Sequence, residues 1–141
     1  MNISKFTQKS VQAVQDLEKV AYEYGNQEIE QEHLLYTLLT QEDSLILKLI
    51  EKMEINKEYF LNTVKNALDA KVKVSGGELR FGQYLNKALV NAEDEAKAMG
   101  DEYVSVEHLF LALLKYPSPS MKKIWSEFGI TKERFLQALS T

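Results

Sequence analysis

The sequence predicts an all-α fold made of two copies of one four-helix unit, about eight helices in all. The first observation is a repeated motif, because EHLLYTLL at residues 32–39 returns as EHLFLALL at residues 107–114. The second is the extent of the repeat. The register holds without a gap, at one constant offset, from Phe6 against Phe81 to Val64 against Leu139, with 17 identities in 59 pairs. Two such copies, each too small for a generous core, are expected to pack around a pseudo-two-fold axis.

Four apolar stripes of helical period follow one another in each copy. The first helix is expected at residues 6–24 and 82–99, with Gly25 and Gly100 as stop signals. The second covers the repeated motif, which we expect to form the most buried helices. The third carries, in the two copies, Ile46, Leu49, Ile50 and Met53, and Met121, Ile124, Trp125 and Phe128.

Capping residues mark where the third and fourth helices begin. Ser44 precedes the third helix in the first copy, and Ser118 precedes it in the second, with Pro119 suited to the first helical position. Asn56 and Thr131 precede the fourth helices.

We interpret residues 1–141 as a single domain. Residues 1–70 form the first repeat and residues 81–141 the second. Residues 71–80 form a linker with paired glycines and alternating polarity.

Composition excludes several functions. Without cysteine, the chain has no disulfide, no thiolate metal site and no cysteine nucleophile. The net charge of -4 is scattered, with no basic stripe to bind phosphates, so we expect no nucleic-acid partner. The N-terminus lacks the apolar run of a signal peptide, and no stretch approaches a membrane span. We therefore expect a cytoplasmic chain without a membrane partner.

The Glu-His pair of the repeated motif has two readings. A metal site would need His33 and His108 to converge from the two halves, because a zinc-protease motif needs two histidines four residues apart. We favour a structural reading, in which Glu32 and Glu107 lie in the first turn of their helices and interact with the helix dipole. The histidines are then half-buried at the rim of the core.

Catalytic motifs are absent from the sequence. It has no phosphate-binding G-x-x-x-x-G-K-[ST] loop, no G-x-G-x-x-G and no G-x-S-x-G elbow. We therefore expect no catalytic residues, no metal, no cofactor and no enzymatic activity in this chain.

The gapless duplication, the segments NQEIEQEHLL and GDEYVSVEHLFLALL, the junction VSGGELRFGQYL and the opening MNISKFTQKS together resemble the N-terminal domain of the Clp/Hsp100 family of AAA+ unfoldases. The resemblance covers essentially the whole chain. It implies a double four-helix repeat that binds client proteins or adaptors and passes them to a hexameric, ATP-driven ring. ATP and Mg²⁺ would belong to that ring, which this chain does not contain.

Within the family, GDEYVSVEHL and VSGG followed by GQYL resemble the ClpB disaggregase branch more than the ClpA and ClpC branches. The resemblance then implies unfolded or aggregated client proteins as partners. The alternative is docking of a dedicated adaptor or co-chaperone, as in a ClpA or ClpC unfoldase coupled to a peptidase. The isolated domain is expected to be a monomer and the full-length protein a hexamer.

The ClpB-like pattern implies a polar contact set at Thr7, Asp101 and Glu107. In that reading Glu107 contacts the client, whereas its repeat mate Glu32 keeps a structural role. Thr7 has a competing reading as the N-cap of the first helix, and Asp101 as an acid that suits any turn after glycine.

Client binding also needs apolar surface. Val11 and Val90 depart from the stripe of the first helix in each repeat, and are candidates for an exposed patch. Leu89, at the edge of the stripe, is a candidate for the same groove. The competing reading is that these residues are buried between the halves or are ordinary scattered surface residues.

Overall fold

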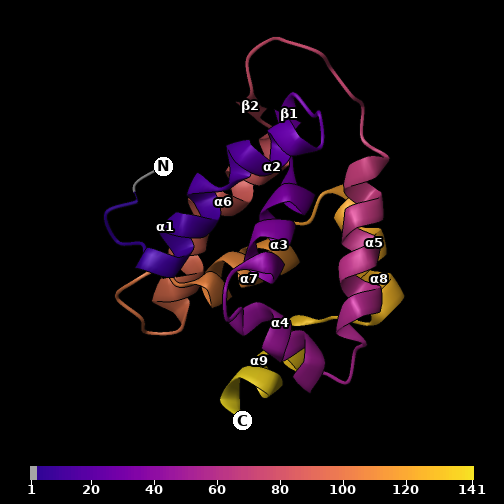
Figure 1. Ribbon diagram of the computed structural model, residues 1–141. Helices are drawn as coiled ribbons and strands as arrows, with labels where there is room; N and C mark the ends of the chain where they lie inside the picture. The colour runs from indigo at the N-terminus through magenta and orange to yellow at the C-terminus, as the bar shows by residue number, and fades with distance from the viewer. Residues whose placement is uncertain (1–2) are drawn as a thin grey trace.

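The computed structural model describes residues 3–141, and these contain nine α-helices and two short strands (Figure 1). The first repeat holds α1 (Gln8–Gln15), α2 (Leu17–Glu23), β1 (Glu28–Ile29), α3 (Gln31–Thr40), α4 (Leu45–Lys52) and α5 (Lys57–Asp69). After a loop come β2 (Arg80–Phe81), α6 (Gln83–Ala98), α7 (Val106–Lys115), α8 (Pro119–Phe128) and α9 (Lys132–Ser140). The predicted all-α class is confirmed. Within residues 3–141, no helix is long and apolar enough to cross a membrane.

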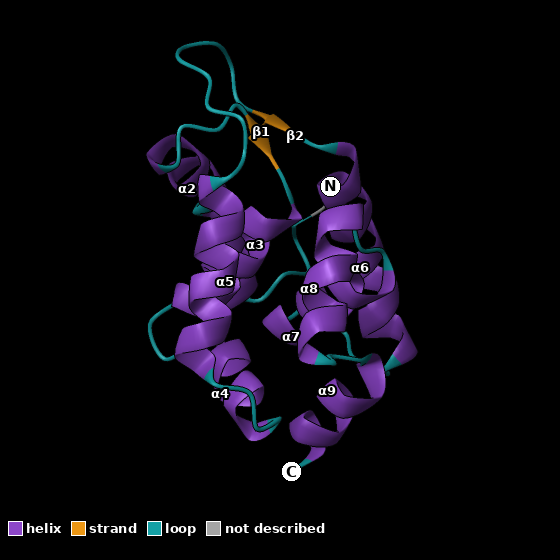
Figure 2. Ribbon diagram, turned by 90° about the vertical axis from the view of Figure 1, so that its right-hand side faces the viewer, coloured by secondary structure: helices purple, strands orange, loops and turns teal. Residues whose placement is uncertain are grey.

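The duplication predicted from the sequence is visible in the helices. The offset that aligns the two sequence copies carries both ends of α3 onto those of α7, and the start of α5 onto the start of α9. Figure 2 shows α2 to α5 on one side of the molecule and α6, α8 and α9 on the other. The tandem four-helix repeat is therefore confirmed.

The first helix differs from the prediction in one repeat. Residues 6–24 form two helices, α1 and α2, separated at Asp16, whereas α6 is uninterrupted. Asp16 has φ -79° and ψ -6°, but its N–H still donates to the Gln12 carbonyl, so the break is a local bend. Phe6 lies outside the helix, because Thr7 caps α1 with its hydroxyl, which accepts from the Ser10 N–H at 3.2 Å.

The other predicted caps are confirmed. The side chains of Ser44, Asn56, Ser118 and Thr131 each accept the backbone N–H three residues on, and Pro119 occupies the start of α8. These bonds satisfy N–H groups that have no partner within the helix. The helix starts that the sequence predicted are therefore fixed by local chemistry.

The residues at the start of each repeat pair with a short segment of the other repeat. β1 pairs with β2 in parallel, so that Ile29 of the first repeat lies opposite Phe81 of the second. The equivalent pair, Phe6 with Val104, forms a parallel bridge at the other end of the interface. These two pairs are related by the same offset as the sequence copies, as pseudo-two-fold symmetry requires. Figure 2 shows β1 and β2 at one end of the molecule, spanning the two sides.

A single hydrophobic core runs through both repeats. As predicted, α3 and α7 are almost entirely buried. Phe110 of α7 stacks on Phe135 with ring centroids 4.5 Å apart, and it forms a T-shaped pair with Trp125 at a centroid separation of 5.2 Å. Phe60 of the first repeat lies 6.5 Å from the same tryptophan ring. The repeats therefore share one core and cannot be separated without exposing it.

Candidate functional site

Gln31, the first residue of α3, joins the two repeats. Its side chain is fully buried, and its Nε2 donates to the backbone carbonyls of Tyr84 at 3.0 Å and Tyr116 at 2.8 Å. Its Oε1 accepts the N–H of Ser118 at 2.8 Å. All three partners belong to the second repeat. The equivalent position in the second repeat is Val106, whose side chain cannot form hydrogen bonds, so the second repeat has no matching clamp onto the first.

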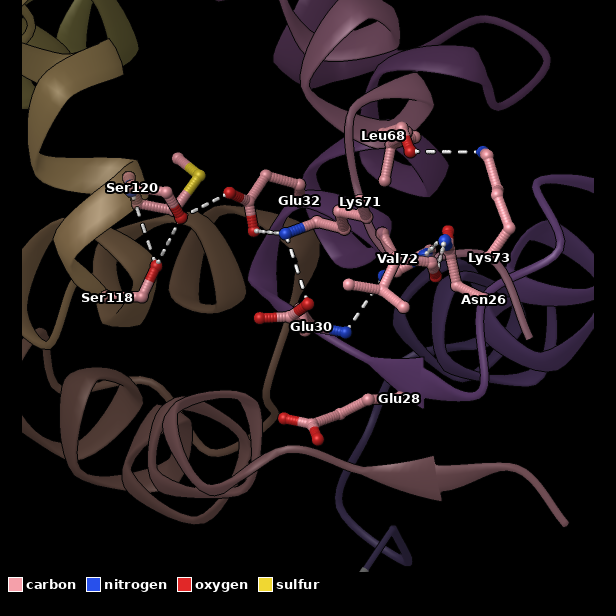
Figure 3. Close-up of polar contacts among 12 residues, drawn as sticks. Asn26, Glu28, Glu30, Glu32, Leu68, Lys71, Val72, Lys73, Ser118 and Ser120 are labelled. Atoms are coloured by element: carbon pink, nitrogen blue, oxygen red, sulfur yellow. Dashed lines mark hydrogen bonds and ion pairs between the residues drawn. The ribbon is translucent and has the colours of Figure 1, made fainter.

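Glu32 forms a second connection, at the start of the linker (Figure 3). Its side chain is 1% exposed, and its Oε2 accepts a short hydrogen bond from the hydroxyl of Ser120 in α8. The Nζ of Lys71 lies 3.3 Å from Oε1 of Glu32 and 3.2 Å from Oε2 of Glu30. Glu32 lies in the first turn of α3, as the sequence predicted. The structure shows in addition that this carboxylate is buried between the first repeat, the linker and α8.

The two histidines are buried, which corrects the prediction that they are half-buried at the rim. His33 is 0% and His108 1% exposed. The Nδ1 of each ring accepts the N–H of the residue before its helix, Glu30 or Ser105, at 2.8 Å. This contact supplies an acceptor for an N–H group at each helix start.

The second nitrogen of each ring has a partner seven residues earlier in the chain. Nε2 of His33 lies 2.9 Å from Oδ1 of Asn26, and Nε2 of His108 lies 2.8 Å from Oδ2 of Asp101. Because Nδ1 accepts, each ring carries its proton on Nε2 and donates it to these oxygens. The histidine of the motif is therefore a structural connector. No group of three potential metal ligands occurs among residues 3–141.

We expect His33 to make the folded state less stable as the pH is lowered. Burial, and then the charge of Lys71, lowers the pKa of His33 from 6.5 to about 4. The unfolded chain therefore binds this proton near pH 6.5, before the folded chain does. The stabilisation is complete above pH 6.5 and is lost as the pH falls towards 4. From this group alone, urea unfolding should show a loss of about 2 to 3 kcal/mol between pH 7 and pH 4.5.

The ring of His33 provides a direct check. Its NMR signals should stay constant from pH 8 to pH 5, and a titration midpoint near pH 6.5 would contradict the prediction. The substitution His33→Gln should remove the corresponding part of the pH dependence.

Thr7 and Glu107 line one hollow of about 220 Å³, where the two repeats meet. The first repeat contributes Thr7 and Lys9 from the start of α1, and Gln41, Asp43 and Leu45 from the α3–α4 connection. The start of α7 contributes Ser105, Val106 and Glu107. Two residues that the resemblance implied as contacts are therefore neighbours in space.

Three charged side chains, Lys9, Asp43 and Glu107, line the hollow. Asp43 is paired with Lys48 at 2.6 Å, and this hydrogen bond lowers the pKa of the Asp43 carboxyl. Nζ of Lys9 donates to the Glu42 carbonyl at 2.7 Å. Within the part of the chain that the structure describes, the Glu107 carboxylate has no ion-pair partner. The hollow thus combines an available carboxylate with an apolar wall.

Leu45 supplies the exposed part of that wall, at 38% exposure, and was not among the residues predicted for the site. Its signal was in the sequence, because it stands just before the apolar stripe of the third helix and is not needed by that stripe. An apolar residue outside the core-facing stripe is a candidate for surface contact.

The remaining predicted contacts lie elsewhere. Asp101 is 48% exposed and holds His108, which gives it a structural task. Val90 is 62% exposed on α6, and Val11 is half-buried against the core. Leu89 is 2% exposed within the core, so its side chain does not reach the surface. None of these four residues lines the hollow that contains Thr7 and Glu107.

Comparison with known proteins gives consistent results. Residues 5–128 match the family model "Clp repeat (R) N-terminal domain". The chain is 38% identical over 145 residues to the chaperone protein ClpB of Nitratidesulfovibrio vulgaris, covering 99% of this chain and 17% of that protein. The chain thus spans about a sixth of the length of this relative.

Solved structures share the fold. The N-terminal domain of Hsp104 from Candida albicans superposes with a TM-score of 0.82 at 21% identity, covering 96% of this chain and 89% of that one. A complex of the ClpV N-domain with a VipB peptide gives a TM-score of 0.72 at 20% identity, covering 98% and 89%. The matched family is that of the N-terminal domain, distinct from the ATPase modules to which ATP and Mg²⁺ belong. The chain belongs to the Clp repeat N-terminal domain family.

Proposed function

We propose that this chain is the client-binding N-terminal module of a ClpB-like disaggregase, and that it binds unfolded or aggregated polypeptides for delivery to an ATP-driven hexameric ring. The observation that carries the proposal is the hollow at the repeat boundary, which brings Thr7 and Glu107 together. The identity to ClpB proteins over the whole chain supports the branch. A cytoplasmic location follows from the same proposal.

The hollow suits weak binding of many sequences. At about 220 Å³ it accepts one or two apolar side chains next to Leu45 and Val106. An extended client could place alternate side chains there, while the Glu107 carboxylate favours a neighbouring cation. Such contacts depend little on the amino-acid sequence of the client. Several modules on one ring would raise the apparent affinity by local concentration.

Val90 provides a second contact in this proposal. It is exposed on α6 and lies outside the hollow. Thr7 and Asp101 would act mainly by holding the surface in shape, since their side chains already have partners in the structure. Leu89 is left out because it is buried.

An amide NMR titration with a permanently unfolded protein tests the proposal. We expect shifts to cluster at Thr7, Leu45 and Glu107, with binding in the micromolar to millimolar range. The double substitution Leu45→Ser/Glu107→Gln should weaken binding about ten-fold, equivalent to about 1.4 kcal/mol. The control Tyr22→Ser removes a side chain that is 81% exposed and outside the hollow.

Two outcomes would contradict the client-binding proposal. In the first, the unfolded protein shifts no residue of the hollow, or the control weakens binding as much as the double variant. In the second, a single folded partner binds tightly while unfolded chains do not. That second result would favour the adaptor-docking function of a ClpA or ClpC unfoldase.

A further inference from the structure

A second hollow, of about 350 Å³, lies at the other end of α7, where α7, α8 and the start of α9 meet. Its apolar lining includes Leu114, Pro117 and Trp125. The rise along α7 from Val106 to Lys115 is about 13 Å, so this site is separate from the hollow at Glu107. The proposed client site leaves this surface unused.

Three lysines, Lys115, Lys122 and Lys132, line this second hollow, which we call the lysine-rimmed hollow. No acidic residue lines it. Lys115 lies 3.7 Å from the buried Glu95, whereas Lys122 and Lys132 have no acidic partner within residues 3–141. A chain with a net charge of -4 therefore presents a locally basic rim around an apolar floor.

The basic rim is specific to the second repeat. At the positions aligned with the three lysines, the first repeat has Thr40, Leu47 and Lys57, of which only one is basic. The four-helix unit does not need lysine at the first two of these positions in order to fold, because the first repeat has Thr40 and Leu47 there and still forms the corresponding helices α3 and α4. Their presence is better explained by what approaches this face.

We propose that the lysine-rimmed hollow binds an acidic segment of a partner protein that carries a leucine or phenylalanine. The apolar side chain would pack against Trp125 and Leu114, and flanking carboxylates would pair with Lys122 and Lys132. An apolar group alone would leave the lysines unused, and a basic segment would be repelled. This partner differs from the client proposed for the first hollow, where the Glu107 carboxylate would favour a cation.

Trp125 reports directly on the site, because it is the single tryptophan of the chain and lines the hollow. The indole is held in place by a hydrogen bond from Nε1 to the Leu113 carbonyl at 3.2 Å. A peptide with two leucines flanked by glutamates should change its emission saturably. The affinity should weaken in about 0.5 M salt, which screens exposed charges. Replacing the glutamates by glutamines should weaken it as well.

Charge reversal separates this site from general electrostatics. The double substitution Lys122→Glu/Lys132→Glu should weaken peptide binding by about ten-fold or more. The matched control Lys19→Glu/Lys65→Glu makes the same change in net charge on α2 and α5 and should leave the affinity within about two-fold. Circular dichroism of both variants should match the parent chain, because all four side chains lie on the surface or partly so.

Four results would overturn the proposal. The peptide leaves the Trp125 emission unchanged, or binds equally well after reversal of Lys122 and Lys132. Vesicles containing phosphatidylglycerol bind through these lysines while the peptide does not, which would identify an anionic membrane surface instead. Sedimentation shows that the face pairs two copies of this chain. The client-binding proposal is tested by a different measurement, the NMR shifts of Thr7 and Glu107 with unfolded protein. The two proposals can therefore fail independently.

Discussion

Replacing Gln31 by glutamate should destabilise the fold more than any other single change considered. The substitution keeps the side chain's size and keeps an acceptor for the Ser118 N–H. It replaces a donating Nε2 by a negatively charged oxygen that faces the carbonyls of Tyr84 and Tyr116. Both carbonyls lose this donor and face a negative charge on a side chain that is fully buried, so we expect the free energy of unfolding to fall by about 3 to 5 kcal/mol.

Urea unfolding at pH 7 measures this effect, with Gln12→Glu as control. Gln12 is exposed in the middle of α1, so its change should stay within about 0.5 kcal/mol. If Gln31→Glu were as mild as the control, Gln31 would not be the clamp between the repeats that the structure describes.

Lys71→Met should give the second largest loss, about 3 kcal/mol. Lys71 is 13% exposed and pairs with Glu32, whose side chain is 1% exposed. Removing the cation leaves a buried carboxylate with only the Ser120 hydroxyl as partner. Desolvation of an unpaired charge costs far more than an exposed ion pair contributes.

A double-mutant cycle tests the origin of that loss. Glu32→Gln/Lys71→Met removes both charges and should recover stability to within about 1 kcal/mol of the parent chain. As a control, Arg80→Met breaks an exposed ion pair, in which the Arg80 side chain is 65% exposed and the Glu28 side chain 45%. This substitution should cost about 0.5 kcal/mol or less. A cycle in which the double variant is no more stable than Lys71→Met would point to lost packing of the lysine stem instead.

Much of the fold was predictable because its determinants are local. The caps at Asn56 and Thr131 act on N–H groups within the same turn, and the constant offset between the repeats is visible by inspection. The pairing of Phe6 with Val104 was not predictable, because a two-residue bridge has no periodicity. Burial of His33 was also missed, since position alone does not distinguish the rim from the core.

The linker shows how a local pattern can mislead. The alternation of lysine and valine at residues 71–74 favours buried valines and exposed lysines. In the structure both valines are exposed, Val72 at 80% and Val74 at 41%, whereas the Lys71 side chain is only 13% exposed and pairs with Glu32. Lys73 stays exposed, and its Nζ donates to the Tyr24 carbonyl at 2.6 Å. These partners come from distant parts of the chain, which no local pattern includes.

The site was predictable only in part for a similar reason. The resemblance implied Thr7 and Glu107, and these lie together in the structure. Leu89 was assigned from a helical wheel, which cannot show that α7 packs along α6 and covers the edge of its stripe. Which face of a helix stays open depends on packing that the sequence of that helix does not specify.

The pairing of residues 5–7 with Val104 of the other repeat also affects when the first repeat can complete its fold during synthesis. The Thr7 N–H donates to the Val104 carbonyl, and the Val104 N–H donates to the Lys5 carbonyl. Residues 5–7 therefore lack these partners until residue 104 has left the ribosome. The first repeat must wait as an incomplete unit while most of the second is translated, exposing apolar surface for that interval. A domain proposed to recognise unfolded chains would itself pass through such a state each time it is made.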